Sequence, residues 1–79
     1  MITAARIDVM LSTLNATDVG TLDSVLDKLR AVQQDLDALG ETALAARASG
    51  AMRALGQGDI EEFRRARAFL QSKIGHLRP

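Results

Sequence analysis

This sequence has no cysteine, one histidine and a single proline, which stands at the last position. Without cysteine the chain can form neither disulfides nor thiolate metal sites, and one histidine is too few for a histidine-based zinc site. No apolar run approaches the ~20 residues that a membrane-spanning helix needs, and the N-terminus lacks the basic-then-apolar order of a secretory signal. We therefore expect no cofactor, no metal and no membrane partner, and a reducing location, the cytoplasm.

Aromatic residues are nearly absent as well, because the chain has only Phe63 and Phe69 and neither tryptophan nor tyrosine. Its 79 residues allow one small domain, 1–79, and a domain of this size buries only about 60% of its extended surface on folding. Such domains depend on disulfides, a metal, regular helix packing or a partner subunit. Since the first two are excluded, regular helix packing and self-association remain.

The residues that are present favour helices. Apolar side chains recur with helical spacing in four segments, approximately residues 3–14, 22–39, 42–56 and 59–74. No segment shows the two-residue alternation of a strand, and the short connections favour antiparallel hairpins. The sequence therefore predicts an all-α fold, a small helical bundle of three main helices plus a short N-terminal helix.

The second segment has the clearest pattern. Its apolar residues are spaced by three and four positions, as along the seam of a coiled coil: Leu22, Val25, Leu29, Val32, Leu36 and Leu39. We expect this seam to be hidden from water, either inside one chain or across a dimer axis. Thr21 or Asp18 is suited to cap the start of the helix, and Gly40 is suited to end it.

The first and third helices carry more specific expectations. Thr3 is the predicted N-cap of the first helix. The packing face of the third helix is expected to consist of Leu44, Ala48, Ala51 and Leu55, and its small residues let neighbouring helices approach closely. Gly50, in the middle of this helix, marks a close crossing or a bend.

The stretch LGQGDIEEF, Leu55 to Phe63, has the general form of a phosphate-binding loop, with two glycines before a helix. However, a helix precedes it instead of a strand, the GK[ST] ending is absent, and the carboxylate of Asp59 would repel phosphate. Asp59 and Glu62 have the spacing of a capping box. We interpret the stretch as a corner between two helices, with Gly56 or Gly58 ending the third helix.

The two halves of the chain differ in charge although the net charge is zero. Residues 1–41 carry three basic and seven acidic side chains, a net charge of −4, and residues 42–79 carry seven basic and three acidic ones, a net charge of +4. One interpretation is attraction between packed helices or between subunits. The other is a basic surface that binds an acidic partner.

No set of residues suggests catalysis. The only histidine, His76, lies near the C-terminus, and the serines stand in no nucleophile motif. Calcium is not expected either, because DLDALGE, Asp35 to Glu41, departs from the EF-hand pattern at Leu39. We expect that the protein is not an enzyme.

The function predicted from these features is a small helical protein–protein interaction or adaptor module that self-associates. Phe69 lies off the apolar stripe of the fourth helix, so we expect it to contact a partner, which is another protein or a second copy. We expect the same of any leucine of the second helix's seam that the chain does not cover itself. The other predicted contact residues are basic: Arg64, Arg65, Arg67 and Lys73. The alternative is a small nucleic-acid-associated regulator that uses the basic C-terminal half. In that case Glu61 and Glu62 offset part of the charge by pairing with Arg65.

Overall fold

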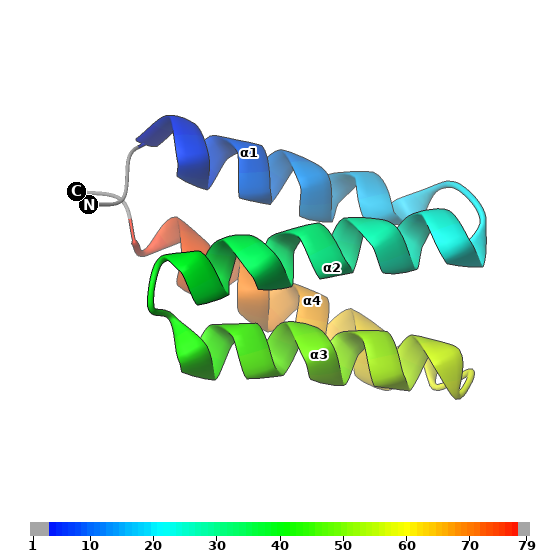
Figure 1. Cartoon of the computed structure of the whole chain (residues 1–79). Helices are drawn as coiled ribbons and strands as arrows, with labels where there is room; N and C mark the ends of the chain where they lie inside the picture. Colours follow the sequence, from blue (N-terminus) through cyan, green and yellow to red (C-terminus); the bar gives the residue numbers. More distant parts are fainter. Residues whose placement is uncertain (1–3, 78–79) are drawn as a thin grey trace.

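A computed structural model describes residues 4–77 and contains four α-helices. They are α1 (Ala4–Asn15), α2 (Leu22–Ala38), α3 (Thr42–Gly56) and α4 (Ile60–Gly75), with a short 3-10 helix, η1 (Ala16–Asp18), after α1 (Figure 1). The described residues include no strand, so the predicted all-α class is confirmed. Apart from the start of the first helix, which was predicted at a residue outside the described range, each predicted helix end lies within one residue of the observed end. The predicted cap Thr3 lies outside the described residues.

Consecutive helices run antiparallel and pack as a square (Figure 1). α2 and α3 each pack against the helices before and after them in sequence, and α1 packs against α4, while no Cα atoms of the diagonal pairs α1–α3 and α2–α4 come within 8 Å of each other. The α1–α2 pair therefore forms one side of the bundle and the α3–α4 pair forms the opposite side. Although α1 is the shortest of the four helices, it completes the square, because its residues Ile7, Met10 and Leu14 are fully buried.

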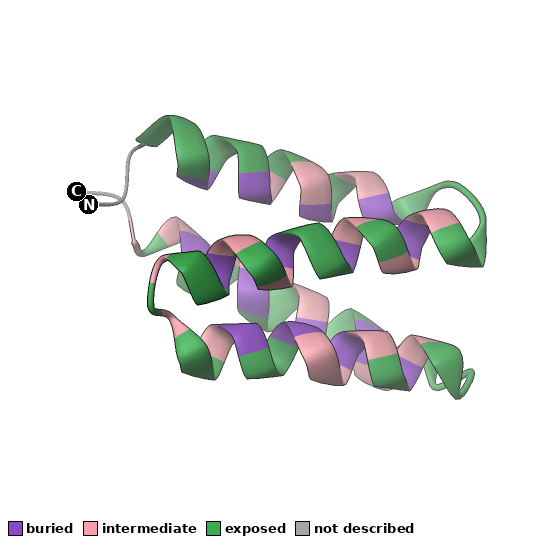
Figure 2. Ribbon diagram, viewed as in Figure 1, coloured by how far each residue is buried: buried purple, intermediate pink, exposed green. Residues whose placement is uncertain are grey.

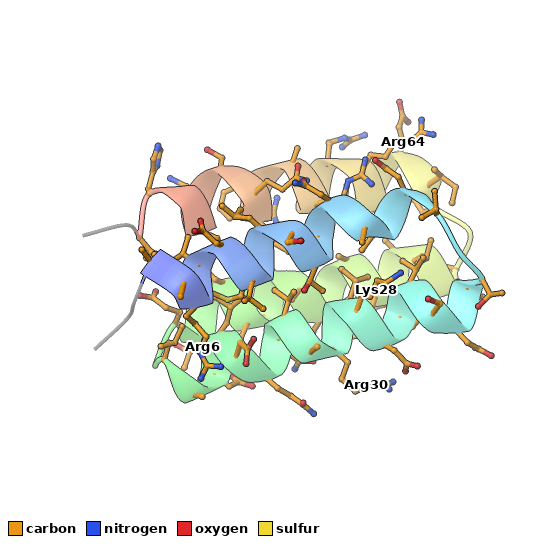
Figure 3. All side chains as sticks on the ribbon, turned by 90° about the horizontal axis from the view of Figure 1, so that it is seen from above. Arg6, Lys28, Arg30 and Arg64 are labelled. Carbon is orange, nitrogen blue, oxygen red and sulfur yellow. The ribbon has the colours of Figure 1, made fainter. Side chains whose placement is uncertain are left out.

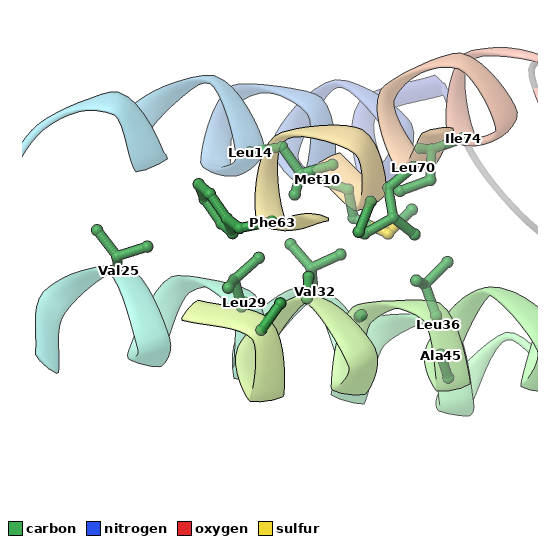
Figure 4. Close-up of a cluster of buried hydrophobic side chains, with 14 of the residues drawn as sticks. Met10, Leu14, Val25, Leu29, Val32, Leu36, Ala45, Phe63, Leu70 and Ile74 are labelled. Atoms are coloured by element: carbon green, nitrogen blue, oxygen red, sulfur yellow. The ribbon is translucent and has the colours of Figure 1, made fainter. Parts of the chain in front are cut away.

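The seam of α2 packs inside the single chain. Val25, Leu29, Val32 and Leu36 are buried against side chains from the other three helices (Figures 2 and 4). Leu22, which begins α2, is 52% exposed and is therefore not covered within the single chain. Since the monomer itself covers most of the seam, the burial of these residues requires no dimer axis.

α3 packs through alanines more completely than the sequence analysis predicted. Its buried residues are Ala45, Ala48, Ala51 and Ala54, while Leu44 and Leu55 are only half-buried at the edges. These small side chains let α3 lie close to both of its neighbours. Gly50 does not mark a close crossing, because a Cβ built there meets no atom within 4 Å. The helix continues through this glycine.

The ends of α2 and α3 are closed by the same local geometry. Gly40 and Gly58 follow these helices with positive φ values of 79° and 76°. In each turn the next residue donates its N–H to a carbonyl five positions earlier, as Glu41 does to Leu36 at 2.9 Å. At the start of α2, the hydroxyl of Thr21 accepts a bond from the N–H of Ser24 at 3.1 Å, so Thr21 is the cap.

Candidate interaction surface

The backbone N–H groups of the loop between α3 and α4 are bonded within the corner itself. Gly58 donates its N–H to the carbonyl of Leu55 at 3.1 Å, and Asp59 donates to Ala54 at 2.9 Å. Asp59 also caps α4, because its carboxylate accepts the N–H of Glu62 at 3.1 Å. The predicted corner is therefore confirmed.

The predicted capping box is only half formed. The N–H of Asp59 is already bonded to Ala54, and the carboxylate of Glu62 pairs with Arg65 at 3.4 Å. Arg65 also lies 3.8 Å from Glu61. These are the intrahelical pairs that the sequence spacing predicts.

Arg67 points toward α1 and η1. It forms an ion pair with Asp18 and donates a hydrogen bond to the hydroxyl of Thr17 at 3.3 Å. Its guanidinium lies 5.5 Å from the centre of the Phe63 ring, and its side chain is only 18% exposed. Arg67 therefore holds η1 against α4, and its predicted role in binding a partner stays a prediction.

Arg64 is exposed at the surface of α4 and points away from the bundle (Figure 3). It forms no ion pair with any described residue. The three neighbouring arginines of α4 thus have three different environments. They are not brought together into one surface.

Phe69 and Lys73 do come together. Phe69 is 37% exposed, and the ammonium of Lys73 lies 5.7 Å from the centre of its ring. Arg47 of α3 contacts the same ring, with its guanidinium carbon 4.4 Å from the centre. Cations at these distances are attracted to the negative face of the ring. They also fix the position of the partly exposed phenylalanine.

Arg47 was not among the contact residues predicted from the sequence. Arg47 and Phe69 each stand eleven positions from Gly58. In an antiparallel helical hairpin, residues at equal distances from the turn lie at the same level along the helix axes. This count gives the level of Arg47, but which face of each helix meets the other depends on the packing.

A hollow of about 380 Å³ lies between α3 and α4 beside this aromatic residue. It is lined by Ala43, Ala46, Arg47, Gly50, Glu62 and Ala66. Glu62, Ala66, Phe69 and Lys73 are spaced by four, three and four positions, so they share one face of α4. We call the hollow together with Phe69 and Lys73 the α3–α4 groove. Its floor is made of small residues, and Arg47 and Lys73 make one end of it basic.

Few ion pairs join the two halves of the chain among the described residues. Of the ion pairs between described residues, only Arg67–Asp18 connects the first half to the second. The α1–α2 side therefore keeps an acidic excess and the α3–α4 side a basic one. Since α2 packs against α3 and α1 packs against α4, the attraction between packed helices that the sequence suggested stays a prediction.

Within residues 4–77, no three His, Asp or Glu side chains gather closely enough to hold a metal ion. None of the helices in this range has both the length and the apolar character needed to cross a bilayer. No protein-family model, curated protein or solved structure matches this chain at a significant level.

Proposed function

We propose that this protein is a small helical protein–protein interaction module that self-associates through the α3–α4 groove and catalyses no reaction. The observation that carries the proposal is the partly exposed Phe69, held between Arg47 and Lys73 at the end of the groove. The absence of catalysis and a cytoplasmic location stay predictions from the sequence.

The physical properties of Phe69 favour a contact role. Aromatic residues and arginines supply much of the binding energy of protein interfaces when a partner covers them. A ring already fixed by two cations loses little conformational freedom on binding, and this lowers the entropic cost of association. The small residues of the adjoining floor allow a helix to approach closely.

The fold also limits which surface can self-associate. The seam of α2 is occupied within the monomer, so a second copy must bind to the outside of the bundle. The α3–α4 groove combines an exposed aromatic residue, a hollow of about 380 Å³ and a basic end on the bundle surface. It is therefore the surface that best supports association.

The substitution Phe69→Ala tests this proposal. We expect the wild-type mass to rise with concentration between about 1 µM and about 1 mM, the range in which small interfaces dissociate. Phe69→Ala should shift that rise to at least about tenfold higher concentration, because the aromatic contact is lost. The measurement is static light scattering, with far-UV circular dichroism to show that helicity is kept.

Val9→Ala is the matched control, since Val9 is an exposed apolar residue on α1, a helix that does not contact α3. This variant should associate like the wild type. A wild-type mass that stays constant over the whole range would reject self-association.

The second candidate function is binding to nucleic acid. It is favoured by the basic α3–α4 side and by Arg64, which is exposed and forms no ion pair with a described residue. Against it, Arg65 and Arg67 already pair with Glu61, Glu62 and Asp18. Binding to nonspecific duplex DNA at low ionic strength distinguishes this function from the first.

A further inference from the structure

The acidic side of the bundle has an exposed helical face that is long enough to cover the α3–α4 groove and is opposite to its basic end in charge. This α2 outer face consists of residues on the side of α2 away from the core, all of them exposed: Asp23, Asp27, Arg30, Ala31, Gln34, Asp37 and Ala38. Arg30 pairs with Asp27 at 3.2 Å, while Asp23 and Asp37 form no ion pair with a described residue. The face is therefore acidic, with two alanines along it.

We propose, on the basis of the function proposed above, that self-association is head to tail. The α2 outer face of one copy occupies the α3–α4 groove of the next copy. The groove then accommodates a helix whose contact residues are small and acidic. Both surfaces lie on every molecule, so each copy can bind two neighbours.

Charge and shape together favour this arrangement over a symmetric dimer. Two facing α2 outer faces would bring the Asp23 and Asp37 side chains of both copies together, and like charges placed opposite each other oppose association. Two facing grooves would leave both hollows without a helix to fill them. The contact between a groove and an α2 outer face fills the hollow and places Asp37 beside the basic end of the groove.

The dimensions and direction of the two surfaces agree. Asp27 to Ala38 and Glu62 to Lys73 each cover eleven positions, about 16 Å of helix. With α2 of one copy parallel to α4 of the next, Asp37 lies at the end formed by Arg47 and Lys73. Ala31 then lies near Ala66, and Asp27 lies at the level of Glu62 together with Arg30, its ion-pair partner.

This contact is heterologous, since it joins two different surfaces. Repeating it builds an open chain or a closed ring and does not stop at a dimer. A single helix seated in a shallow groove falls at the small end of interface sizes, so the association is weak. It must be measured at high protein concentration.

Two single substitutions test the arrangement, each placing a long side chain on one surface only. Ala46→Arg fills the groove and leaves the α2 outer face intact, while Ala31→Arg obstructs the α2 outer face and leaves the groove intact. Both alanines are exposed on helices, and arginine is a good helix former, so both variants should fold. Ala5→Arg, at an exposed position on α1, is the control with the same change of residue.

We expect Ala46→Arg and Ala31→Arg each to remain monomeric at concentrations where the wild type and Ala5→Arg associate. An equimolar mixture of the two blocked variants should give a complex of two chains and no larger species. In that mixture one intact groove meets one intact α2 outer face, and the other two surfaces are blocked. Sedimentation velocity separates the monomer, the two-chain complex and longer assemblies.

Three results would overturn the head-to-tail arrangement. One is wild-type assembly that stops at a dimer, and another is a mixture that remains monomeric. The third is loss of association in Ala46→Arg with wild-type behaviour in Ala31→Arg, which would show that something other than α2 occupies the groove. None of these three results would contradict the proposal that the protein self-associates. A wild type that never associates would reject both proposals together.

Discussion

Arg64, Arg65 and Arg67 lie within four positions of one helix, yet their surroundings have little in common. Successive helical residues point about 100° apart, so Arg67 is turned toward η1 while Arg64 faces solvent. The pairing of Arg65 with Glu61 and Glu62 was predictable from helical spacing alone. The partner of Arg67 was not, because Asp18 is 49 positions away in sequence and only tertiary packing brings it close.

Phe69 shows how far a periodic pattern determines a candidate site. The pattern placed this residue off the apolar stripe, and the structure finds it 37% exposed. The pattern did not indicate that Arg47 would lie over the ring, because that contact depends on how α3 and α4 align across their turn. The periodic pattern of a helix predicts which of its side chains are exposed. It does not predict which residue of the neighbouring helix contacts them.

The two ends of the α2 seam give a prediction about stability. Leu29 is fully buried and Leu22 is 52% exposed, although both belong to the same apolar pattern. Leu29→Ala should lower the free energy of unfolding by about 2–5 kcal/mol, because it removes buried methyl groups and leaves a cavity. Leu22→Ala should cost no more than about 1 kcal/mol, since much of that side chain already contacts water. Urea unfolding followed by circular dichroism compares the two, and equal losses would show that the seam is not packed as described.

The helical elements were predictable because their ends are determined by local geometry. A threonine cap at Thr21 and left-handed glycines at Gly40 and Gly58 act within a few residues of themselves, so the sequence shows them directly. The contribution of α1 was harder to assess. Ile7, Met10 and Leu14 indicate an apolar face, but only the assembled square shows that α2 and α4 both cover it.

Alanine substitutions at Gly50, in the middle of α3, and at Gly58, in the turn after it, should change the free energy of unfolding in opposite directions. Gly50 lies inside the helix with open space around it, so Gly50→Ala should raise the free energy of unfolding by about 0.5–1 kcal/mol. Gly58 has a φ of 76°, a left-handed conformation that strains any residue with a Cβ, so Gly58→Ala should lower the free energy of unfolding by about 1–2 kcal/mol. Thermal and urea unfolding of both variants provide the comparison. A stabilised Gly58→Ala would contradict the left-handed turn.

At the scale of the whole molecule, the sequence gives the charge of each half but not the relation between the halves. The values of −4 and +4 follow from counting residues. They are equally compatible with helices that neutralise each other and with a molecule that has two oppositely charged sides. The square packing combines the two, because it places α1 and α2 on one side and α3 and α4 on the other while α2 packs against α3 and α1 against α4 (Figure 1). The spatial relation between the two charged halves therefore depends on how the helices pack, which residue composition does not determine.

The same charge distribution predicts weak binding to nucleic acid. Four basic residues of the α3–α4 side form no ion pair with another described residue: Arg47, Arg53, Arg64 and Lys73. Two of them, Arg47 and Lys73, already contact the Phe69 ring.

Nonspecific DNA binding depends on the number of phosphates neutralised and typically has a Kd of about 1–100 µM at physiological salt. With so few available cations and a net charge of zero, we expect labelled duplex DNA to show no saturable binding below about 100 µM protein. Fluorescence anisotropy over a series of salt concentrations measures this. A Kd near 1 µM that weakens steeply with salt would favour the nucleic-acid function, and it would assign the basic side to phosphate instead of to the acidic face of another copy.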